Sequence, residues 1–276
     1  MVWVAAFGAS ALLAYLLRGE PERPPRRGGW AVLAGLLIAG AARGGVPQFL
    51  LLHAYWLALG LLLVMGAVDD RWTLSPRAKF GFQAAAALLF LYLTPPGVWA
   101  GRLEMLGGLG LPVAFLWLVG VTNALNLLDN MDGLCAGVGA VAALAACAFG
   151  WGATDLLGGL AAGLTAFLLC NVPPARLYLG DAGSHLVGFS LAVLPLYGLP
   201  ASAVPGIVLL LAVPIADTTF VFFNRLRERR SPFEGGKDHL SHRLWRRGWS
   251  SWKVAFVFWG AAALAAVAAG LLVGRA

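Results

Sequence analysis

Long apolar stretches recur along the whole chain and leave little polar surface for an exterior that faces water. Of the 276 residues, 60% are apolar and only 12% are charged. A soluble domain carries about 25% charged residues. A helix needs about 20 apolar residues to cross the hydrocarbon core of a bilayer. The sequence therefore predicts an all-α, multi-pass membrane protein, and we expect a single integral-membrane domain over residues 1–276.

Charged residues and Pro/Gly breaks divide the chain into about ten candidate spans. Their expected ranges are 1–17, 29–42, 47–66, 80–94, 109–122, 134–150, 156–171, 185–199, 202–222 and 252–273. The second of these stretches is short for a span. The first has no positive segment before it and no small-residue cleavage motif, so we interpret it as a retained span and not as a signal peptide.

Alternate connections between these stretches carry nearly all of the positive charge. The connections 18–28, 67–79, 123–133, 172–184 and 223–251, taken with the first residues of the last stretch, hold 17 of the 20 Lys and Arg. Such residues gather on the cytoplasmic side of membrane proteins. We therefore expect these connections to face the cytoplasm, both termini to lie on the outer side, and the protein to reside in the cytoplasmic membrane. This placement accounts for the net charge of +7, so we expect no nucleic-acid partner.

The acidic residues follow the same division. Of the 13 Asp and Glu, only Glu104 and Asp155 fall outside the cytoplasmic connections and the membrane edges next to them. Carboxylates at membrane depth are costly and usually functional. Their convergence predicts a metal site, or a phosphate site built around a metal, at the cytoplasmic face.

The first polar motif is the pair Asp69-Asp70 at the end of an apolar stretch. Two adjacent carboxylates repel each other, and a divalent cation or a nearby Lys or Arg relieves the repulsion. A solvated helix end is the alternative. Ser75-Pro76 then predicts a helix start, with Ser as the N-cap and Pro at the first helical position.

The second motif spans 123–134. Asn123, Asn126, Asp129 or Asn130, and Gly133 are three or four residues apart, so a helix would place them on one stripe. Amide and carboxylate oxygens are hard ligands that suit Mg²⁺. A run of caps and turns between two helices is the alternative. Three Asn and two Asp within ten residues of a chain so poor in polar groups favour a functional role.

The third motif, Leu179 to His185, reads LGDAGSH and leads into the eighth stretch. Its small residues would let backbone N–H groups approach an anion at a helix N-terminus, and Asp181 would hold a cation that bridges to that anion. An ordinary N-cap is the alternative.

The fourth motif is the basic connection after the ninth stretch. A dense patch of Arg and Lys beside carboxylates suits a polyanion such as a diphosphate. Attraction to anionic lipid is the alternative, and it explains His239 and His242 less well than the arginines. The residues concerned are Asp217, Arg225, Arg227, Arg229, Arg230 and the segment Asp238-His239-Leu240-Ser241-His242-Arg243-Leu244.

Taken together, these stretches resemble the polyprenyl-phosphate N-acetylhexosamine-1-phosphate transferase family, of the glycosyltransferase 4 type. The matching pieces are Pro25–Gly29, Asp69-Asp70 with Leu74-Ser75-Pro76 and Lys79-Phe80, Asn123–Leu134, Gly180–Ser184 and Asp238–Leu244. Their order, spacing and side of the membrane agree with the family, and the resemblance covers nearly the whole chain. Five such motifs in register are highly specific.

The last motif separates two branches of the family. The phospho-MurNAc-pentapeptide translocases carry a run of three His there, which this chain lacks, and Ser241 stands where many members have a middle His. The pattern is more similar to the undecaprenyl-phosphate GlcNAc-1-phosphate transferases. Translocase-type activity is the alternative within the family.

The resemblance implies a reaction and a set of site residues. A phosphate oxygen of undecaprenyl or another polyprenyl phosphate would attack the sugar-linked phosphorus of a UDP-sugar, UDP-GlcNAc by the branch, and release UMP. The implied cofactor is Mg²⁺, with Mn²⁺ as an alternative, held by Asp181, Asn126 and Asp70. The implied catalytic set is Asp69, Asp70, Asp181, His239 and His242. The implied substrate-binding set is Lys79, Asn123, Asn126, Asp129, Asp132, Asp217 and Arg243.

Asp69 matches the position of the family's proposed base. A phosphate monoester has a second pKa of about 6, so the lipid phosphate is largely ionised without a base. A role in orienting the lipid or the metal is therefore the alternative for Asp69. His239, His242 and Arg243 would contact the diphosphate by resemblance.

Two other classes of protein compete with the transferase. A cation-coupled transporter would also use acidic residues, but transporter sites sit near the bilayer midplane, often in helices related by an inverted repeat. Here the acidic residues gather at one face, and no repeat relates the two halves. A non-catalytic scaffold gives no reason for Asp69-Asp70 or the Asn-rich motif. The oligomeric state is left open.

Overall fold

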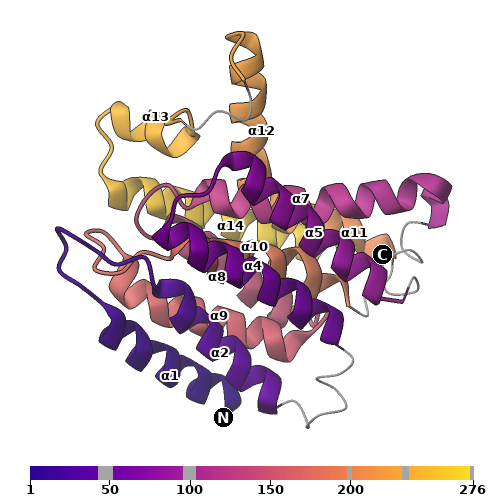
Figure 1. The fold of residues 1–276 in the computed structure, drawn as a ribbon, viewed down its shortest axis with the longest axis horizontal. Coiled ribbons are helices and arrows are strands. Elements are labelled where there is room, and N and C mark those ends of the chain that lie inside the picture. Colours follow the sequence, from indigo (N-terminus) through magenta and orange to yellow (C-terminus); the bar gives the residue numbers. More distant parts are fainter. Residues whose placement is uncertain (43–51, 96–103, 198–200, 232–235, 274–276) are drawn as a thin grey trace.

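The computed structural model describes residues 1–42, 52–95, 104–197, 201–231 and 236–273 (Figure 1). Within these ranges the chain is helical, and the only β-type pairing is one isolated bridge between Arg26 and Tyr178. The helices are α1 (Val2–Leu17), α2 (Gly28–Ala42), α4 (His53–Arg71), α5 (Pro76–Leu93), α7 (Gly110–Leu128), α8 (Leu134–Ala148), α9 (Thr154–Asn171), α10 (Gly180–Val193), α11 (Val204–Leu210), α12 (Ala212–Arg227), α13 (Leu240–Arg246) and α14 (Ser251–Val273), with 3₁₀ turns at Glu104–Leu109, Leu194–Leu196 and Ala201–Ala203. The all-α prediction is confirmed for the described residues.

Within the described residues, each of the ten expected stretches falls mainly on helix, but several helices extend into the polar motifs. Residues 47–51 and 198–199 of these stretches lie outside the described residues. α4 and α7 continue to Arg71 and Leu128, and α10 begins at Gly180, five residues before the expected start at 185. α5 starts at Pro76, where the Ser75 side chain accepts a hydrogen bond from the Ala78 N–H, as the N-cap pattern predicts. Many of the polar motif residues therefore lie in the last or first turn of a helix.

Three helices of the described residues are long and apolar enough to cross a membrane alone: Gly107–Leu128, Thr154–Asn171 and Ser251–Val273. α11 and α12 make a fourth if the bent pair counts as one span, while α1, α2 and α8 are apolar but shorter. The chain is therefore a membrane protein with several helices able to span the bilayer. The number ten and the outer location of both termini stay predictions.

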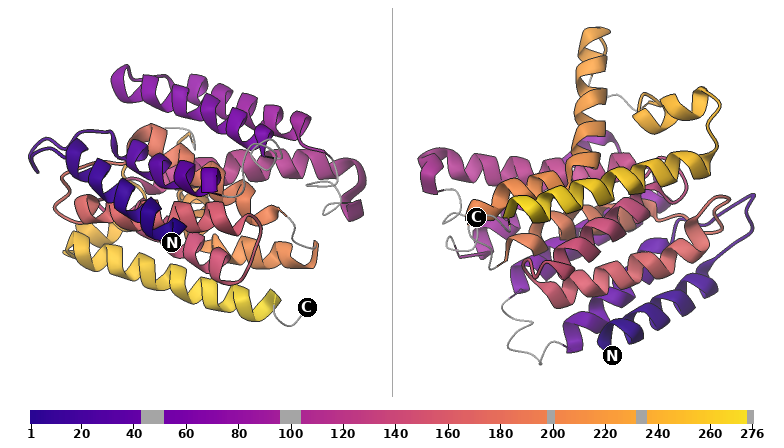
Figure 2. Two further views of the ribbon diagram at one scale, coloured as in Figure 1. Left: turned by 90° about the horizontal axis from the view of Figure 1, so that it is seen from below. Right: turned by 180° about the vertical axis from the view of Figure 1, so that it is seen from behind.

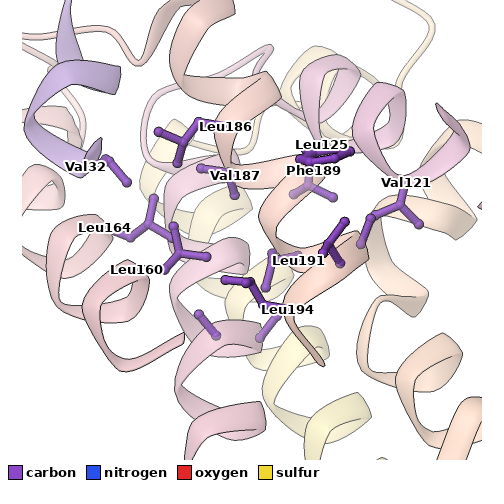
Figure 3. Packing of buried hydrophobic residues seen from close by; sticks show 14 of the residues in the cluster. Val32, Val121, Leu125, Leu160, Leu164, Leu186, Val187, Phe189, Leu191 and Leu194 are labelled. Carbon is purple, nitrogen blue, oxygen red and sulfur yellow. The ribbon is translucent and has the colours of Figure 1, made fainter. Parts of the chain in front are cut away.

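α10 is the central helix, and thirteen of its fourteen residues are buried. It packs against α2, α4, α7 and α8, and Figure 3 shows Phe189 of α10 beside Leu125 of α7. Its small residues allow backbones to touch, since a Cβ added at Gly66 of α4 would lie 2.3 Å from the Cα of Ala182. This contact holds the end of α4, one turn beyond Gly66, against the beginning of α10.

α11 and α12 meet at an angle of 71° near Leu211. Pro214 lies in the first turn of α12 and lacks the N–H that would continue the hydrogen-bond ladder of α11 across the junction. In Figures 1 and 2, α12 projects away from the bundle and α13 lies near α12. α14 then runs alongside the other helices of the bundle. The bend therefore directs the end of α12 and the segment after it sideways from the bundle.

Candidate active site

The connections 18–28 and 172–184, the first and fourth of the charged set, pair through their backbones. The N–H of Gly19 donates to the carbonyl of Arg176 (2.8 Å), that of Tyr178 to Pro25 (2.9 Å), and that of Gly28 to Tyr178 (2.9 Å). These two connections are about 150 residues apart in sequence and lie together at one end of the bundle (Figure 1). The pairing also places the Pro25–Gly29 motif beside the start of α10.

The turn between α7 and α8 joins the same end. The Asp132 carboxylate accepts a hydrogen bond from the N–H of Ala175 (3.0 Å). The Ser241 hydroxyl donates to the amide oxygen of Asn130 (2.7 Å), whose amide nitrogen donates to the carbonyl of Leu127 (2.7 Å). The connections that carry most of the positive charge in the sequence therefore meet through direct contacts.

Two adjoining cavities open where these connections meet. The first, of about 280 Å³, is lined by Arg26, Asp70, Asp129, Asn130, Met131, Asp132, Asn171, Tyr178, Gly180 and Asp181. The second, of about 380 Å³, is lined by Met131, Asp132, Lys237, His242, Trp245, Arg246 and Ser251. Four carboxylates and one guanidinium thus surround the first cavity, and the second shares Met131 and Asp132 with it and adds basic side chains.

Asp70 caps the N-terminus of α10. Its Oδ1 accepts a hydrogen bond from the N–H of Asp181 (2.9 Å), and its Oδ2 accepts one from the N–H of Ala182 (3.4 Å). Gly180 makes this possible, because it has φ +77° and a Cβ there would lie 2.7 Å from Asp70 Oδ2. The expectation that these N–H groups bind a substrate anion is therefore wrong in this structure, since the protein's own carboxylate occupies them.

Asp69, Lys79 and Asp181 form an ion-pair triad. The Lys79 ammonium lies 2.6 Å from Asp69 Oδ2 and 2.5 Å from Asp181 Oδ2. Asp69 is buried, and its Oδ1 accepts a hydrogen bond from the N–H of Leu74 (2.7 Å). Both oxygens of Asp69 are thus engaged, and Lys79 links α5 to both α4 and α10.

The carboxylates at the first cavity outnumber the positive charges near them. Burial, and then the charges of Asp181 and Asp70, raise the pKa of Asp129 to about 8. Burial also raises the pKa of Asp70, although two backbone N–H groups oppose the shift. For Lys79, burial lowers the pKa, but hydrogen bonds to Asp181 and Asp69 more than offset it, so the net shift is upward. The site therefore carries an excess of negative charge.

The Asn-rich motif does not form one helical stripe. α7 ends just before Asp129, so Asn123 and Asn126 are helical while Asp129 to Gly133 make a turn. Helical geometry ends at Asp129, which has φ −76° and ψ 48°, and Gly133, with φ +72°, then precedes α8. The Asn126 amide nitrogen donates to the Ser184 hydroxyl (2.9 Å), and neither Asn123 nor Asn126 lines the two cavities above. The single-stripe prediction is wrong.

Asp217 lies behind His239 and does not face a cavity. The Asp217 side chain is 1% exposed, with Oδ2 at 2.6 Å from His239 Nδ1 and Oδ1 accepting from the N–H of Leu240 (2.8 Å). Because a carboxylate oxygen accepts hydrogen bonds, a donating His239 Nδ1 would leave Nε2 for another partner. We therefore expect Asp217 to orient His239, and its predicted contact with substrate stays a prediction.

The rest of the last motif is anchored on α12. Asp238 pairs with Arg225 (3.0 Å) and Arg230 (3.4 Å), and these two arginines outweigh the effect of burial and lower the pKa of Asp238. Arg243 donates to the Asp238 carbonyl (3.3 Å) and lies over the ring of Phe220 (4.7 Å). Arg243 thus faces α12, whereas His242 lines the second cavity.

The cavity residues that were not predicted as site residues include Arg26, Asn171 and Tyr178. Arg26 lies in the Pro25–Gly29 motif, so the family resemblance carried a signal for it. Asn171 ends an apolar stretch, and it accepts from the N–H of Gly133 (3.0 Å) and donates to the carbonyl of Leu177 (2.9 Å). Tyr178 had no signal in the sequence, because its position depends on the backbone pairing with the first connection.

Within the described ranges, no three or more His, Cys, Asp and Glu side chains are grouped as a metal site. Asp70 binds the start of α10, and Lys79 binds Asp181. Three of the four carboxylates of the first cavity, those of Asp70, Asp132 and Asp181, therefore accept from the protein's own donors.

Asp217→Asn should lower kcat roughly 10- to 100-fold with a smaller effect on KM, the range typical for loss of a supporting hydrogen-bond partner. The amide would still accept from Leu240 but would oppose the Nδ1 proton of His239. Steady-state kinetics on the purified protein would measure this. Glu228→Gln removes an exposed carboxylate just after α12 and should leave kcat unchanged. Equal kcat in both variants would contradict the assignment.

A bundle of apolar helices that encloses a carboxylate-lined polar site at one end defines a membrane enzyme for polar or anionic substrates. Residues 52–199 match the model of Glycosyl transferase family 4, and the chain belongs to this family.

Three relatives illustrate the similarity. The chain is 32% identical over 244 residues to a probable undecaprenyl-phosphate N-acetylglucosaminyl 1-phosphate transferase of Bacillus subtilis, covering 82% of this chain and 67% of the relative. It is 32% identical to a decaprenyl-phosphate N-acetylglucosaminephosphotransferase of Mycolicibacterium smegmatis, covering 82% and 66%. It is 30% identical to the undecaprenyl-phosphate alpha-N-acetylglucosaminyl 1-phosphate transferase of Escherichia coli K12, covering 90% and 72%. The chain spans about two thirds of the length of these relatives.

Proposed function

We propose that this chain transfers a sugar-1-phosphate, GlcNAc-1-phosphate by the names of its relatives, from a UDP-sugar to polyprenyl phosphate at the cytoplasmic face of the cell membrane. The observation that carries the proposal is the first cavity, where Arg26 faces four carboxylates at the end of an apolar bundle. Its polar lining suits the diphosphate of the donor, and the surrounding apolar helices suit the polyprenyl chain of the acceptor.

The reaction joins two anions, so the site must neutralise charge and align the attack. A phosphate oxygen of the lipid bonds to the sugar-linked phosphorus of the donor, the bond between that phosphorus and the bridging oxygen breaks, and UMP leaves with the bridging oxygen. The Arg26 guanidinium would take part in holding the diphosphate. Lys237, His242 and Arg246, in the adjoining cavity, would bind the remaining charge.

The donor set at the first cavity fits a hard divalent cation. The oxygen ligands that Mg²⁺ prefers are offered here by Asp70, Asp129, Asp132 and Asp181, and burial, followed by the charges of Asp181 and Asp70, raises the pKa of Asp129. We propose Asp181 and Asp70 as ligands, with Asn126 contributing through its amide oxygen. A bound Mg²⁺, or Mn²⁺ in its place, would supply positive charge to the diphosphate.

Asp69 acts as an orienting residue in this proposal and not as a base. Its Oδ1 is bonded to Leu74 and its Oδ2 to Lys79, so neither oxygen is directed at a substrate proton. The lipid phosphate, with a second pKa of about 6, needs no base at neutral pH.

The test is a panel of radiolabelled donors with undecaprenyl phosphate. UDP-GlcNAc and UDP-MurNAc-pentapeptide are each incubated with the purified full chain, and butanol-soluble label and released UMP are counted. Label from UDP-GlcNAc would support the proposal, and label from UDP-MurNAc-pentapeptide alone would assign the translocase-type alternative. No lipid-linked label from either donor, with protein that is folded by thermal melting, would refute the proposal.

Asp129→Asn should stabilise the metal-free protein at pH 8 and have little effect at pH 4. The folded-state pKa of about 8 lies above the ordinary value of 3.8, so the folded state holds the extra proton and stability falls as pH rises between these values. Above the folded-state pKa, the wild-type protein has lost all of the stability that the protonated Asp129 contributes. Thermal melts in EDTA across this range would measure the difference between the variant and the wild type. A wild-type protein that gains stability relative to the variant as pH rises would contradict the prediction.

A further inference from the structure

Lys79 is the one described ammonium that the structure places between two site carboxylates. It projects from the first turn of α5 and reaches Asp69 on α4 and Asp181 on α10, at 2.6 and 2.5 Å. Three helices are therefore joined through one positive charge.

The two partners of Lys79 differ in surroundings. The Asp69 side chain is 4% exposed, and its second oxygen is fixed by the backbone of Leu74. The Asp181 side chain is 22% exposed and lines the first cavity. Lys79 thus has one partner fixed in the protein and another that faces the substrate space.

We propose that Lys79 is a resident counter-cation that neutralises Asp181 when no divalent ion is present and competes with that ion for the Asp181 carboxylate. When the ion binds Asp181, the Lys79 ammonium would remain paired with Asp69 alone. The inference rests on the proposed function, because it takes Asp181 as a metal ligand. It accounts for the observation that the Asp181 carboxylate is paired with an ammonium of the protein itself.

The competition predicts opposite signs for two substitutions. Lys79→Gln removes the competing charge, so divalent-ion affinity should rise, by roughly tenfold for one unit charge a few ångströms from the ion. Asp69→Asn leaves Lys79 with Asp181 alone and should lower the affinity by a comparable factor. The double variant Asp69→Asn with Lys79→Gln removes one charge of each sign and should lie within about threefold of wild type.

The experiment is a Mn²⁺ titration of the purified full chain in detergent, with free Mn²⁺ measured by electron paramagnetic resonance. Arg77→Gln is the matched control, since Arg77 is an exposed cation on the same turn of α5. It should change the Mn²⁺ Kd less than about twofold, because an exposed charge is screened. Lys79→Arg keeps the charge and should stay below the affinity of Lys79→Gln.

The outcomes separate the two proposals. Opposite shifts in Lys79→Gln and Asp69→Asn support the competition, whereas weaker binding in both, or no shift in Lys79→Gln, would overturn it. If the wild-type chain and every variant bind no Mn²⁺, the metal in the proposed function fails as well. Should Lys79→Gln not fold in detergent, the double variant decides, because competition requires it to bind Mn²⁺ more tightly than Asp69→Asn alone.

Discussion

Asp181→Asn is expected to abolish sugar-phosphate transfer, with kcat lower by at least about a thousandfold, the size of effect seen when a group that stabilises transition-state charge is removed. Asp181 lines the first cavity from the first turn of α10, beside Asp70 and Gly180. The amide keeps the size of the side chain but removes its charge, so the divalent ion of the proposed function would lose a ligand and could no longer supply its charge to the diphosphate.

The same substitution should leave the protein folded. The backbone of Asp181 would still donate to Asp70 and accept from the His185 ring (2.7 Å), and Lys79 would keep Asp69. UMP release and lipid-linked label report the activity, and a tryptophan-fluorescence melt reports the fold. Asp155→Asn is the control, because Asp155 starts α9 whereas Asn171, at the other end of that helix, lines the cavity. Retained turnover in Asp181→Asn would remove the metal assignment.

Gly66→Ala should reduce both stability and activity far more than the addition of one methyl group suggests. A Cβ at Gly66 would lie 2.3 Å from the Cα and N of Ala182, and these backbone atoms cannot turn away as a side chain can. α4 and α10 must then separate, at a cost of about 1–3 kcal/mol. Asp69 and Asp70 follow on the next turn of α4, so the separation also moves the triad and the α10 cap. We expect activity to fall by roughly 100-fold, as misplacement by about 1 Å can cost that much.

Gly60→Ala on the same helix is the matched control. A Cβ at Gly60 has no neighbour within 4 Å. Ala is the better helix former by about 1 kcal/mol, so this variant should be as stable as the wild type or slightly more stable. Thermal melts and transfer assays on both variants make the comparison. Equal melting temperatures and equal transfer activities in Gly66→Ala and Gly60→Ala would show that α4 and α10 do not pack closely at Gly66 and Ala182.

The sequence predicted helices well because apolar length is a local property. The expected stretch 134–150 corresponds to α8 at Leu134–Ala148, and 252–273 to α14 at Ser251–Val273. It predicted helix ends less well where polar residues continue a helix, as Asn126 does in α7 and Asp181 in α10. A polar residue at a helix end and one in a loop look alike in sequence, since only the contacts that satisfy the last backbone groups separate them.

The partner of each site residue could not be read from the motifs. Asp69 and Asp70 are adjacent in sequence, but one pairs with Lys79 and the other caps α10. Asp217 is predicted from its motif to bind substrate, but the motif does not reveal its contact with His239. Arg26 reaches the cavity only because the first connection pairs with the fourth.

The amino-acid sequence by itself determined that this chain is helical, that it belongs in a membrane, and which connections carry its chemistry, because apolar length and charge placement act along the chain. Only the tertiary structure decided which carboxylates face the cavity and which are held by the protein, because that depends on helices more than 100 residues apart in sequence touching through Gly66 and Ala182.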